Sequence, residues 1–487
     1  MDLDPATATA TDLTQALRDR QISSRELLAY LIDRAAELNP ELNAIVAWDT
    51  DRAGAAAAQA DELAARGEFS GPLHGLPMTV KDTYETQGLV TTSGSPDLAK
   101  HVPQADALAV ARLRGAGAII FGKTNTPLFA GDIQTFNEVY GRTNNPWDTT
   151  RTVGGSSGGA AAALAAGLTP LEFGSDIGGS IRNPSHYNGV FGLKPSWGIV
   201  PLRGHIPGPP GSLLEYDVGV AGPLARSVAD LRLALGVTAG PLPAAAAGWR
   251  LELDPGPELN ELNGLRIATV FGAGDGFLPL AADVRASLES FASRIQDAGA
   301  RVEETELPVS LPEGFASWRD VTLPIFGLGL PDEEYDRMKG AEDAPGDDPG
   351  LLAAKALTSR YRSWMRASQI REQQREAWAR FFADYDVVLA PVMPAAAYPH
   401  DTSGTIERRL LDVDGEAVPH ILTMAWCGAI GVVLLPAVAV PTGLTPAGLP
   451  AGVQVIGPFL SDLRLLRIAE LLTAASGNAF VPPPLGQ

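Results

Sequence analysis

Apolar residues recur along this chain with two spacings, one typical of amphipathic helices and one typical of buried strands. Apolar positions three and four residues apart predict two helices within Thr11–Leu38 and a further helix over Ser461–Ala475. Ser23 to Glu26 form a capping box that marks the start of the second N-terminal helix. Short continuous apolar runs predict strands that are covered on both faces, and these runs are Asp386–Pro391, Gly431–Val440 and Val453–Ile456.

Predicted strands and helices alternate through most of the chain. Leu265–Val270, Ala281–Ala298 and Arg301–Leu307 have the pattern of a strand, a helix and an edge strand, which form a βαβ unit. Further helices are predicted at Arg52–Arg66, Asp106–Gly115, Leu224–Leu235 and Leu351–Phe382, and further strands at Asn43–Trp48 and Ala118–Gly122. The alternation indicates an α/β fold.

Composition narrows the function more than it narrows the fold. The 487 residues include 37 Lys and Arg against 57 Asp and Glu, a formal net charge of −20, which disfavours binding to nucleic acid and to anionic membranes. Cys427 is the only cysteine, so we expect no internal disulfide and no Cys-based zinc site. The chain does not open on a basic segment followed by an apolar run, and no window has the length of a membrane span. We therefore expect a cytoplasmic protein.

Two clusters of small residues, Gly154–Gly159 and Gly174–Ser180, flank a run of alanines that predicts a tightly packed helix. Glycines this dense cost backbone entropy, so a fold retains them where it needs unusual dihedral angles or close approach of the chain. Ser180 follows two glycines, which leave the neighbouring backbone amides unshielded. A hydroxyl beside bare amide donors has the parts of a nucleophile with an oxyanion hole.

Each cluster taken alone has other interpretations. The first could be a flexible linker, although a linker would not run directly into an alanine helix. It could also bind phosphate, but the Lys-Ser/Thr ending of a P-loop is absent. Gly154-x-Ser156-x-Gly158 fits the nucleophile elbow of α/β-hydrolases, which requires an upstream hydrophobic strand, whereas residues 144–152 are polar. When each motif is considered alone, a structural role and a catalytic role are about equally well supported.

A strand-like run from Leu76 ends at Lys81 among apolar residues. A lysine in this position could reach water or pair with Asp82, which is the commoner arrangement. Alternatively, burial lowers the pKa of the lysine, so that its neutral amine can serve as a general base. Because neighbouring side chains of a strand point to opposite faces, we expect desolvation to outweigh the charge of Asp82.

Together these motifs resemble the amidase signature family. That family combines Gly-Gly-Ser-Ser-Gly-Gly, an alanine-rich helix, Gly-Thr/Ser-Asp-x-Gly-Gly-Ser-Ile-Arg and Gly-Leu-Lys-Pro. The matching parts of this chain are Gly154–Gly159, Gly174–Arg182 and Gly192–Pro195. The similarity continues in four further segments, Gly75–Asp82, Gly122–Asn125, Gly222–Asp230 and Leu449–Gln454. It covers most of the chain, with only a general likeness from about Pro241 to Asp384.

The resemblance implies a catalytic triad. Ser180 would attack the substrate carbonyl, Lys81 would be the base, and Ser156 would relay the proton from a cis-peptide conformation after Gly155. The oxyanion hole would consist of the backbone amides of Ile177, Gly178, Gly179 and Ser180. No metal and no cofactor are implied.

The resemblance also assigns supporting roles around the triad. Ser157, Asp176 and Arg182 are expected to hold the loops in place, the last two as a buried ion pair. We expect structural roles for Lys123 and Lys194, which also lie in family motifs.

For the fold, the resemblance implies one large domain over residues 1–487, with a central mixed, mostly parallel β-sheet covered by helices on both faces. We expect an N-terminal helical part over 1–68 and a signature core over 69–235. The least family-like segments, 308–350 and 392–420, are expected to shape the acyl or leaving-group pocket. The loops 124–148 and 203–217 are expected to lie near the site because of their length and Gly/Pro content.

The implied function is hydrolysis of carboxylic amide C–N bonds through an acyl-enzyme. The expected partner is a small-molecule substrate, a small or aryl amide, with side activity on esters and carbamates. Leu128, Ala160 and Asn188 depart from common family residues, which affects substrate preference rather than chemistry. We expect a monomer or homodimer.

The main alternative is the glutaminase-type subunit of a tRNA-dependent amidotransferase, which shares the signature but works inside a complex. Such relatives usually show Leu-Asp-Gln-x-Gly-Pro where this chain has Tyr216–Pro223, a difference that favours a stand-alone amidase. A non-catalytic binding protein on the same fold is disfavoured, because Lys81, Ser156 and Ser180 are all present.

Overall fold

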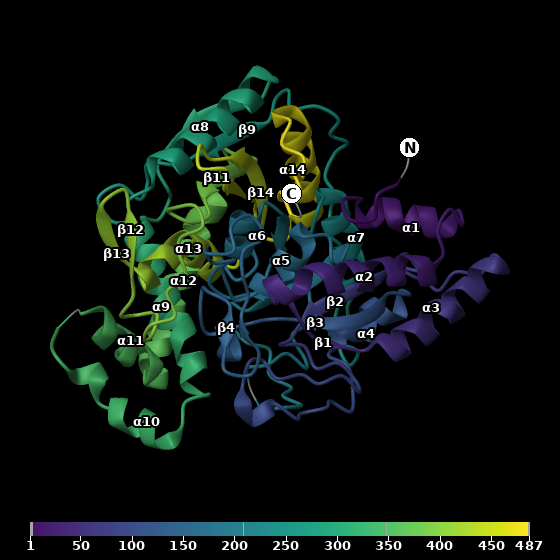
Figure 1. The fold of residues 1–487 in the computed structure, drawn as a ribbon. Coiled ribbons are helices and arrows are strands. Elements are labelled where there is room, and N and C mark those ends of the chain that lie inside the picture. The colour runs from purple at the N-terminus through teal and green to yellow at the C-terminus, as the bar shows by residue number, and fades with distance from the viewer. Residues whose placement is uncertain (1–2, 208, 347, 486–487) are drawn as a thin grey trace.

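A mixed sheet of eight strands forms the centre of the protein, in a computed structural model that describes residues 3–207, 209–346 and 348–485 (Figure 1). The strand order across the sheet is β10-β9-β11-β15-β14-β7-β8-β6. In chain order these strands are β6 (Leu171–Asp176), β7 (Phe191–Lys194), β8 (Val220–Ala225), β9 (Arg266–Thr269), β10 (Arg301–Glu304), β11 (Val387–Pro391), β14 (Ala437–Leu444) and β15 (Pro450–Ile456). Residue 208 of the predicted loop 203–217 and residue 347 of the segment 308–350 lie outside the described residues, as do 1–2 and 486–487.

The predicted α/β fold with a central mixed sheet is confirmed. Within the described sheet, five strands run in one direction, while β15, β7 and β6 run in the other. Parallel neighbours are β10–β9 and β9–β11, and the other pairings are antiparallel. The pairings are therefore more antiparallel than the sequence suggested. One reason is the short turn that joins β14 to β15, because short turns permit only antiparallel neighbours.

Helices cover both faces of this sheet. On one side α7 (Val228–Thr238), α8 (Ala282–Asp297) and α14 (Asp462–Ser476) pack against β8, β14 and β15, with α14 between the other two. On the other side α6 (Arg182–Asn188) packs against β7, β14 and β15, beside α5 (Gly158–Ala165). Every residue of β11 and β15 is buried, which explains their continuous apolar sequences.

The N-terminal part adds a second, three-stranded sheet with the order β1-β3-β2. Its strands are β1 (Ile45–Trp48), β2 (Pro77–Lys81) and β3 (Ile119–Thr124), and β2 packs against β6 of the large sheet. The surrounding helices are α1 (Ala10–Arg18), α2 (Ser24–Leu42), α3 (Thr50–Ala65) and α4 (Leu108–Gly115). The predicted capping box of α2 is confirmed, since Ser23 and Glu26 cap one another. The contact between β2 and β6 brings the end of β2 to the second glycine-rich cluster.

A group of helices on the side opposite α1–α3 forms the other flank of the molecule (Figure 1). It consists of α9 (Leu311–Gly327), α10 (Asp332–Met338), α11 (Pro349–Leu357) and α12 (Tyr361–Phe381), next to α13 (Ala425–Val432) and the hairpin of β12 (Leu410–Val413) and β13 (Glu416–Pro419). A short ladder of β4 (Phe136–Asn137) and β5 (Gly141–Arg142) lies in the predicted loop 124–148. No helix in the described part of the chain is both long and apolar enough to cross a membrane.

The predicted helix 351–382 is two helices, α11 and α12, which are separated at residues 358–360. Two further element predictions are wrong in their boundaries. The predicted helix 224–235 begins only at Val228, after Ser227 caps it through the Asp230 amide, and 220–225 form β8. The predicted strand 431–440 covers the end of α13 and the start of β14. Both segments are largely buried, and in such segments an apolar run does not distinguish a strand from a helix.

Candidate active site

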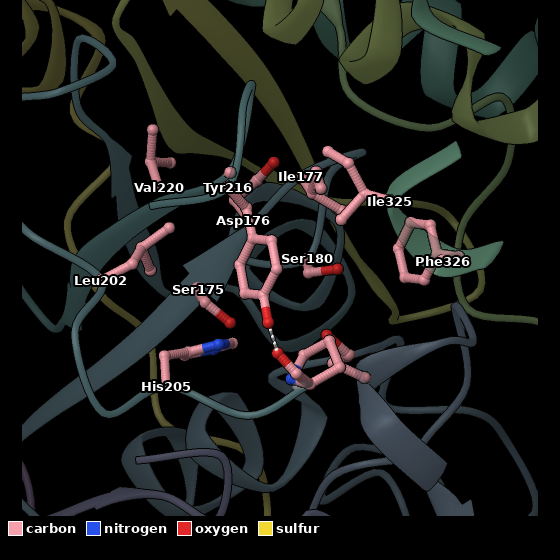
Figure 2. A pocket seen from close by; sticks show the side chains of 14 residues that line it. Ser175, Asp176, Ile177, Ser180, Leu202, His205, Tyr216, Val220, Ile325 and Phe326 are labelled. Atoms are coloured by element: carbon pink, nitrogen blue, oxygen red, sulfur yellow. Dashed lines mark hydrogen bonds between the residues drawn. The ribbon is translucent and has the colours of Figure 1, made fainter. Parts of the chain in front are cut away.

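Lys81, Ser156 and Ser180 come together although they lie far apart in the sequence. Lys81 ends β2, Ser156 belongs to the glycine-rich turn before α5, and Ser180 follows β6 in the turn that leads into α6. Ser156 and Ser180 line the same cavity, and Figure 2 shows Ser180 in it. The packing of β2 against β6 therefore assembles the three predicted catalytic residues at one end of the two sheets.

Lys81 is fully buried, and its side-chain nitrogen contacts two serines. Nζ lies 2.7 Å from Ser156 Oγ and 3.0 Å from Ser175 Oγ. Burial lowers the pKa of Lys81 to about 7, against the opposing charges of Asp176 and Glu172. The carboxylate of Asp82 does not pair with Lys81 and instead accepts a hydrogen bond from the Thr92 hydroxyl at 2.6 Å. The direction of the Lys81 pKa shift agrees with the expectation that desolvation outweighs Asp82.

The turn that carries Ser156 can be built only with small residues. The peptide bond between Gly155 and Ser156 is cis, as the resemblance implied. A Cβ atom on Gly155 would lie 2.7 Å from the carbonyl oxygen of Asp132, so this position requires glycine. Residues 132–134 pack directly against Gly155 and so restrict the position of the turn.

The backbone amides around Ser180 are only partly free. Gly179 N donates to Asp176 Oδ1 at 2.8 Å, so this amide, predicted as part of the oxyanion hole, is already engaged. Within the described residues, the amides of Ile177, Gly178 and Ser180 donate no hydrogen bond to the protein. Three of the four predicted donors thus have no acceptor within the described part of the protein.

Two further contacts keep this turn in place, and one of them was missed by the sequence analysis. Ser157 N donates to the Ser180 carbonyl oxygen at 3.1 Å, which ties the two glycine-rich clusters together. Trp318 Nε1, from α9, donates to the Ile177 carbonyl oxygen at 2.8 Å. The indole of Trp318 occupies the space that a side chain at position 178 would need. Its nearest atom lies 2.7 Å from the place where a Cβ atom on Gly178 would be. No motif around Trp318 signals this role.

The predicted buried ion pair between Asp176 and Arg182 is confirmed. Arg182 donates to both carboxylate oxygens, from Nη2 at 2.8 Å and from Nε at 3.0 Å, and both side chains are fully buried. Burial alone would raise the pKa of Asp176, but the guanidinium outweighs it and lowers that pKa to about 2. Nη1 of Arg182 also donates to Gln454 at 3.0 Å, so the pair links the turn to β15.

We expect Arg182→Met to lower the free energy of unfolding by about 3–5 kcal/mol, because it leaves the Asp176 carboxylate buried without its partner. Urea denaturation followed by tryptophan fluorescence measures the change. The control is Arg25→Met, which removes the exposed arginine of an ion pair of similar length, 2.9 Å to Asp61, and should cost about 1 kcal/mol or less. Equal losses in both variants would contradict the structural role of the buried pair.

The cavity in front of Ser180 has mainly apolar walls. Ile177, Leu202, Val220, Ile325 and Phe326 form these walls, with Ile325 and Phe326 on the side opposite Leu202 (Figure 2). Three polar lining residues were not predicted as site residues, and they are Ser175, His205 and Tyr216. Tyr216 donates from its hydroxyl to the Pro207 carbonyl oxygen, the dashed line in Figure 2. The Gly/Pro content of 203–217 was the only signal that this loop lies at the site.

The two segments expected to shape the pocket lie in different places. Residues 308–350 contribute Ile325 and Phe326 to the cavity wall, from the end of α9. Residues 392–420 line a separate, more open depression, where Tyr398, His400 and His420 are found.

The remaining buried lysines have structural contacts. Lys123 donates to the hydroxyls of Thr86 and Thr91 at 3.0 and 3.2 Å, and Lys194 donates to the Pro195 carbonyl oxygen at 2.9 Å. In the part of the chain that the structure describes, no three His, Cys, Asp or Glu side chains lie together in an arrangement that could hold a metal ion.

Comparison with known proteins agrees with this geometry. The family model described as Amidase matches residues 26–316 and 349–466. A relative from Roseiflexus sp. strain RS-1, the A subunit of glutamyl-tRNA(Gln) amidotransferase, is 34% identical over 485 residues, 95% of each chain. Indoleacetamide hydrolase of Bradyrhizobium diazoefficiens is 34% identical over 461 residues, 94% of this chain and 84% of the relative.

Among solved structures, a bacterial aryl acylamidase belonging to the amidase signature enzymes superposes with a TM-score of 0.82. It is 26% identical to this protein, and the match covers 97% of both chains. The family match, the relatives and the shared fold extend over nearly the whole sequence. The chain therefore belongs to the amidase signature family and is an amidohydrolase.

Proposed function

We propose that the protein hydrolyses small or aryl carboxylic amides through an acyl-enzyme on Ser180, with Lys81 as the base and Ser156 as the proton relay. The observation that carries this proposal is the 2.7 Å contact between Lys81 Nζ and Ser156 Oγ, at the wall of the cavity that also contains Ser180. A serine hydroxyl is a weak nucleophile and needs such a base. A lysine with a pKa of about 7 has a neutral amine available near neutral pH.

The contact between Lys81 and Ser156 supplies one step of the proposed proton path. As Ser180 Oγ attacks the carbonyl carbon, its proton passes to Ser156, and the proton of Ser156 passes to the lone pair of neutral Lys81. When the tetrahedral intermediate collapses, the C–N bond breaks and Ser156 returns a proton to the leaving amine. Water then attacks the acyl-enzyme by the same path and releases the carboxylic acid. The amides of Ile177, Gly178 and Ser180 stabilise the oxyanion, a contribution that typically reaches about 10²–10³-fold per donor.

The apolar lining of the cavity supports an apolar substrate. The aliphatic and aromatic walls suit a phenyl or indole ring, or a short alkyl group, on the reacting amide. Esters and carbamates present the same electrophilic carbonyl, so we include side activity on both. We further propose that the enzyme works as a monomer or homodimer.

The alternative function is that of a glutaminase-type subunit, and the 34% identity to such a relative favours it. Glutamine carries an ammonium and a carboxylate, and burying either is costly unless it is paired. Asp176 is the charged side chain among the lining residues that the structure describes, and Arg182 already neutralises it. The cavity therefore favours an uncharged substrate over glutamine.

A substrate panel tests the two functions against each other. Anilides, short aliphatic amides, aryl carbamates and glutamine would be ranked by kcat/KM, and the purified protein would be checked for a copurifying partner protein. We expect an uncharged aryl amide to rank first and glutamine last. Preference for glutamine, gained only in the presence of a partner protein, would establish the alternative instead.

The pKa of Lys81 predicts how the activity depends on pH. The neutral amine is the active form, so acidification below about pH 7 protonates it, and kcat/KM should fall about tenfold for each further pH unit. Above about pH 8 the rate should reach a plateau. The measurement is kcat/KM on one anilide across this range, with the urea midpoint followed at each pH as a control for unfolding. An optimum near about pH 5 is incompatible with a lysine base.

Single replacements of the histidines should leave the chemistry in place. None of the six is expected to be the base, and within the described residues none contacts Ser156 or Ser180 through a hydrogen bond. The six are His74, His101, His186, His205, His400 and His420. Turnover of an unsubstituted anilide by each variant is the measurement. If one of these variants lost all turnover while its fold stayed intact, the result would support the Ser-His arrangement of an α/β-hydrolase instead of a lysine base.

A further inference from the structure

His205 is a buried histidine whose ring lies in the wall of the catalytic cavity, on the same side as Ser175 (Figure 2). The residue is 7% exposed. Its backbone amide donates to the Leu202 carbonyl oxygen at 2.9 Å, and its ring meets the ring of Tyr84 edge to face, with centroids 5.0 Å apart. Tyr84 is itself fixed by a 2.6 Å hydrogen bond to the Gly174 carbonyl oxygen. The position of the imidazole is thus set by the signature core.

Neither ring nitrogen of His205 has a hydrogen-bond partner among the residues that the structure describes. Two other buried histidines differ in this respect. Both ring nitrogens of His186 lie within 3.2 Å of backbone groups, and those of His74 lie 3.0 Å from Ser70 N and 3.1 Å from the Ala60 carbonyl oxygen. An unpaired buried donor or acceptor is costly, and in native proteins it usually has a ligand or water as its partner.

The imidazole of His205 is electrically neutral. Burial holds its pKa well below the ordinary value for histidine, and the nearby Lys81 and Lys123 act in the same direction. A neutral imidazole offers one N–H donor and one lone-pair acceptor. It suits an uncharged hydrogen-bonding group and has no charge with which to hold a carboxylate.

The other walls of the cavity offer a substrate few unengaged polar side chains. Leu202, Val220, Ile325 and Phe326 are apolar, while Ser156 and Ser180 are committed to the chemistry. Ser175 accepts a hydrogen bond from Lys81, and the Tyr216 hydroxyl donates to the Pro207 carbonyl oxygen. Asp176 is engaged by Arg182. A polar group at the non-reacting end of a bound substrate would find its partner at His205.

The geometry points to His205 as a specificity-determining residue that hydrogen-bonds an uncharged polar substituent of the substrate, such as a hydroxyl, carbonyl or carboxamide group. The inference rests on the proposed amidase function and narrows its substrate class. The preferred substrate is a compact, largely apolar amide with one such substituent away from the scissile bond. Lys81 remains the base, so His205 contributes to substrate recognition and not to proton transfer.

The test compares matched substrates with and without the substituent. One pair is acetanilide and 4-hydroxyacetanilide, which places the hydroxyl on the leaving amine. The other is phenylacetamide and 4-hydroxyphenylacetamide, which places it on the acyl group. The variants are His205→Phe, which keeps a ring against Tyr84, and His205→Gln, which keeps hydrogen-bonding capacity. Leu202→Ala is the control, because it changes the cavity wall without removing a polar group.

For at least one pair, His205→Phe should lower kcat/KM of the hydroxyl substrate about tenfold relative to its unsubstituted partner, the usual scale of one lost hydrogen bond. His205→Gln should keep that ratio within about threefold of the original enzyme. Leu202→Ala should change both members of a pair alike. Using the ratio within a pair removes the intrinsic electronic effect of the hydroxyl group.

Two kinds of failure are distinguishable. If His205→Phe changes both members of both pairs by the same factor while Ser180-dependent turnover persists, the role of His205 is overturned and the amidase proposal stands. If the original enzyme hydrolyses none of the four amides nor any other of the panel, the amidase proposal itself fails. Should the urea midpoint show that His205→Phe has lost its fold, the smaller His205→Leu takes its place. His205→Leu should then show the same change in the ratio of kcat/KM between the two substrates of a pair. An unchanged ratio in this variant would also overturn the role of His205.

Discussion

Replacing Ser180 with alanine should reduce kcat/KM by about a millionfold, the usual cost of removing the nucleophile of a serine hydrolase. Ser180 lines the cavity next to the free amides of Ile177 and Gly178, so no other group in that position can form the acyl-enzyme. The side chain makes no hydrogen bond that the fold depends on within the described residues. The urea midpoint should therefore stay close to that of the original protein.

Two measurements accompany this variant. Turnover of the best panel substrate gives the loss in rate, and labelling with a serine-directed fluorophosphonate, read by peptide mass, gives the modified position. The label should lie on Ser180 and be absent from Ser180→Ala. Ser403→Ala, at an exposed serine, is the matched control and should behave like the original enzyme. Activity in Ser180→Ala, or a label elsewhere in the cavity, would refute the assignment of the nucleophile.

Lys81→Ala and Ser156→Ala should each reduce kcat/KM by about a thousandfold or more, within the range of lost general-base catalysis. Lys81 Nζ and Ser156 Oγ are 2.7 Å apart, so each residue is the next step in the proton path of the other. The double variant should lose little more than either single variant, because the two residues act as one unit. Near-normal turnover by Lys81→Ala would disprove the mechanism.

Lys81→Met separates the loss of the base from the loss of packing. Methionine fills most of the space of the buried lysine stem without an amine, so this variant should lose activity as Lys81→Ala does and fold at least as stably. Its remaining activity should also lack the rise through neutral pH that a lysine base produces. A remaining activity with the original pH profile would mean that another group is the base.

The local parts of the site could be predicted from residue types and their spacing. Glycine clusters mark places where the backbone must turn sharply or approach another segment, and Gly155 and Gly178 both meet such neighbours. The lysine at the end of an apolar strand is buried, one of the two arrangements that its pattern allowed, and Asp176 pairs with Arg182, as the family resemblance implied. These features depend on short-range geometry, which is why patterns in the sequence reveal them.

The groups that reach the cavity from distant segments could not be predicted in this way. Trp318 reaches Ile177 across 141 residues of sequence, and His205 acquires its place through contacts with Tyr84. The occupied amide of Gly179 and the separate position of 392–420 likewise follow from how the loops pack. An aromatic or imidazole side chain has the same local preferences in a core as in a binding site. Its surroundings, and hence its role, are fixed only when segments distant in sequence pack together.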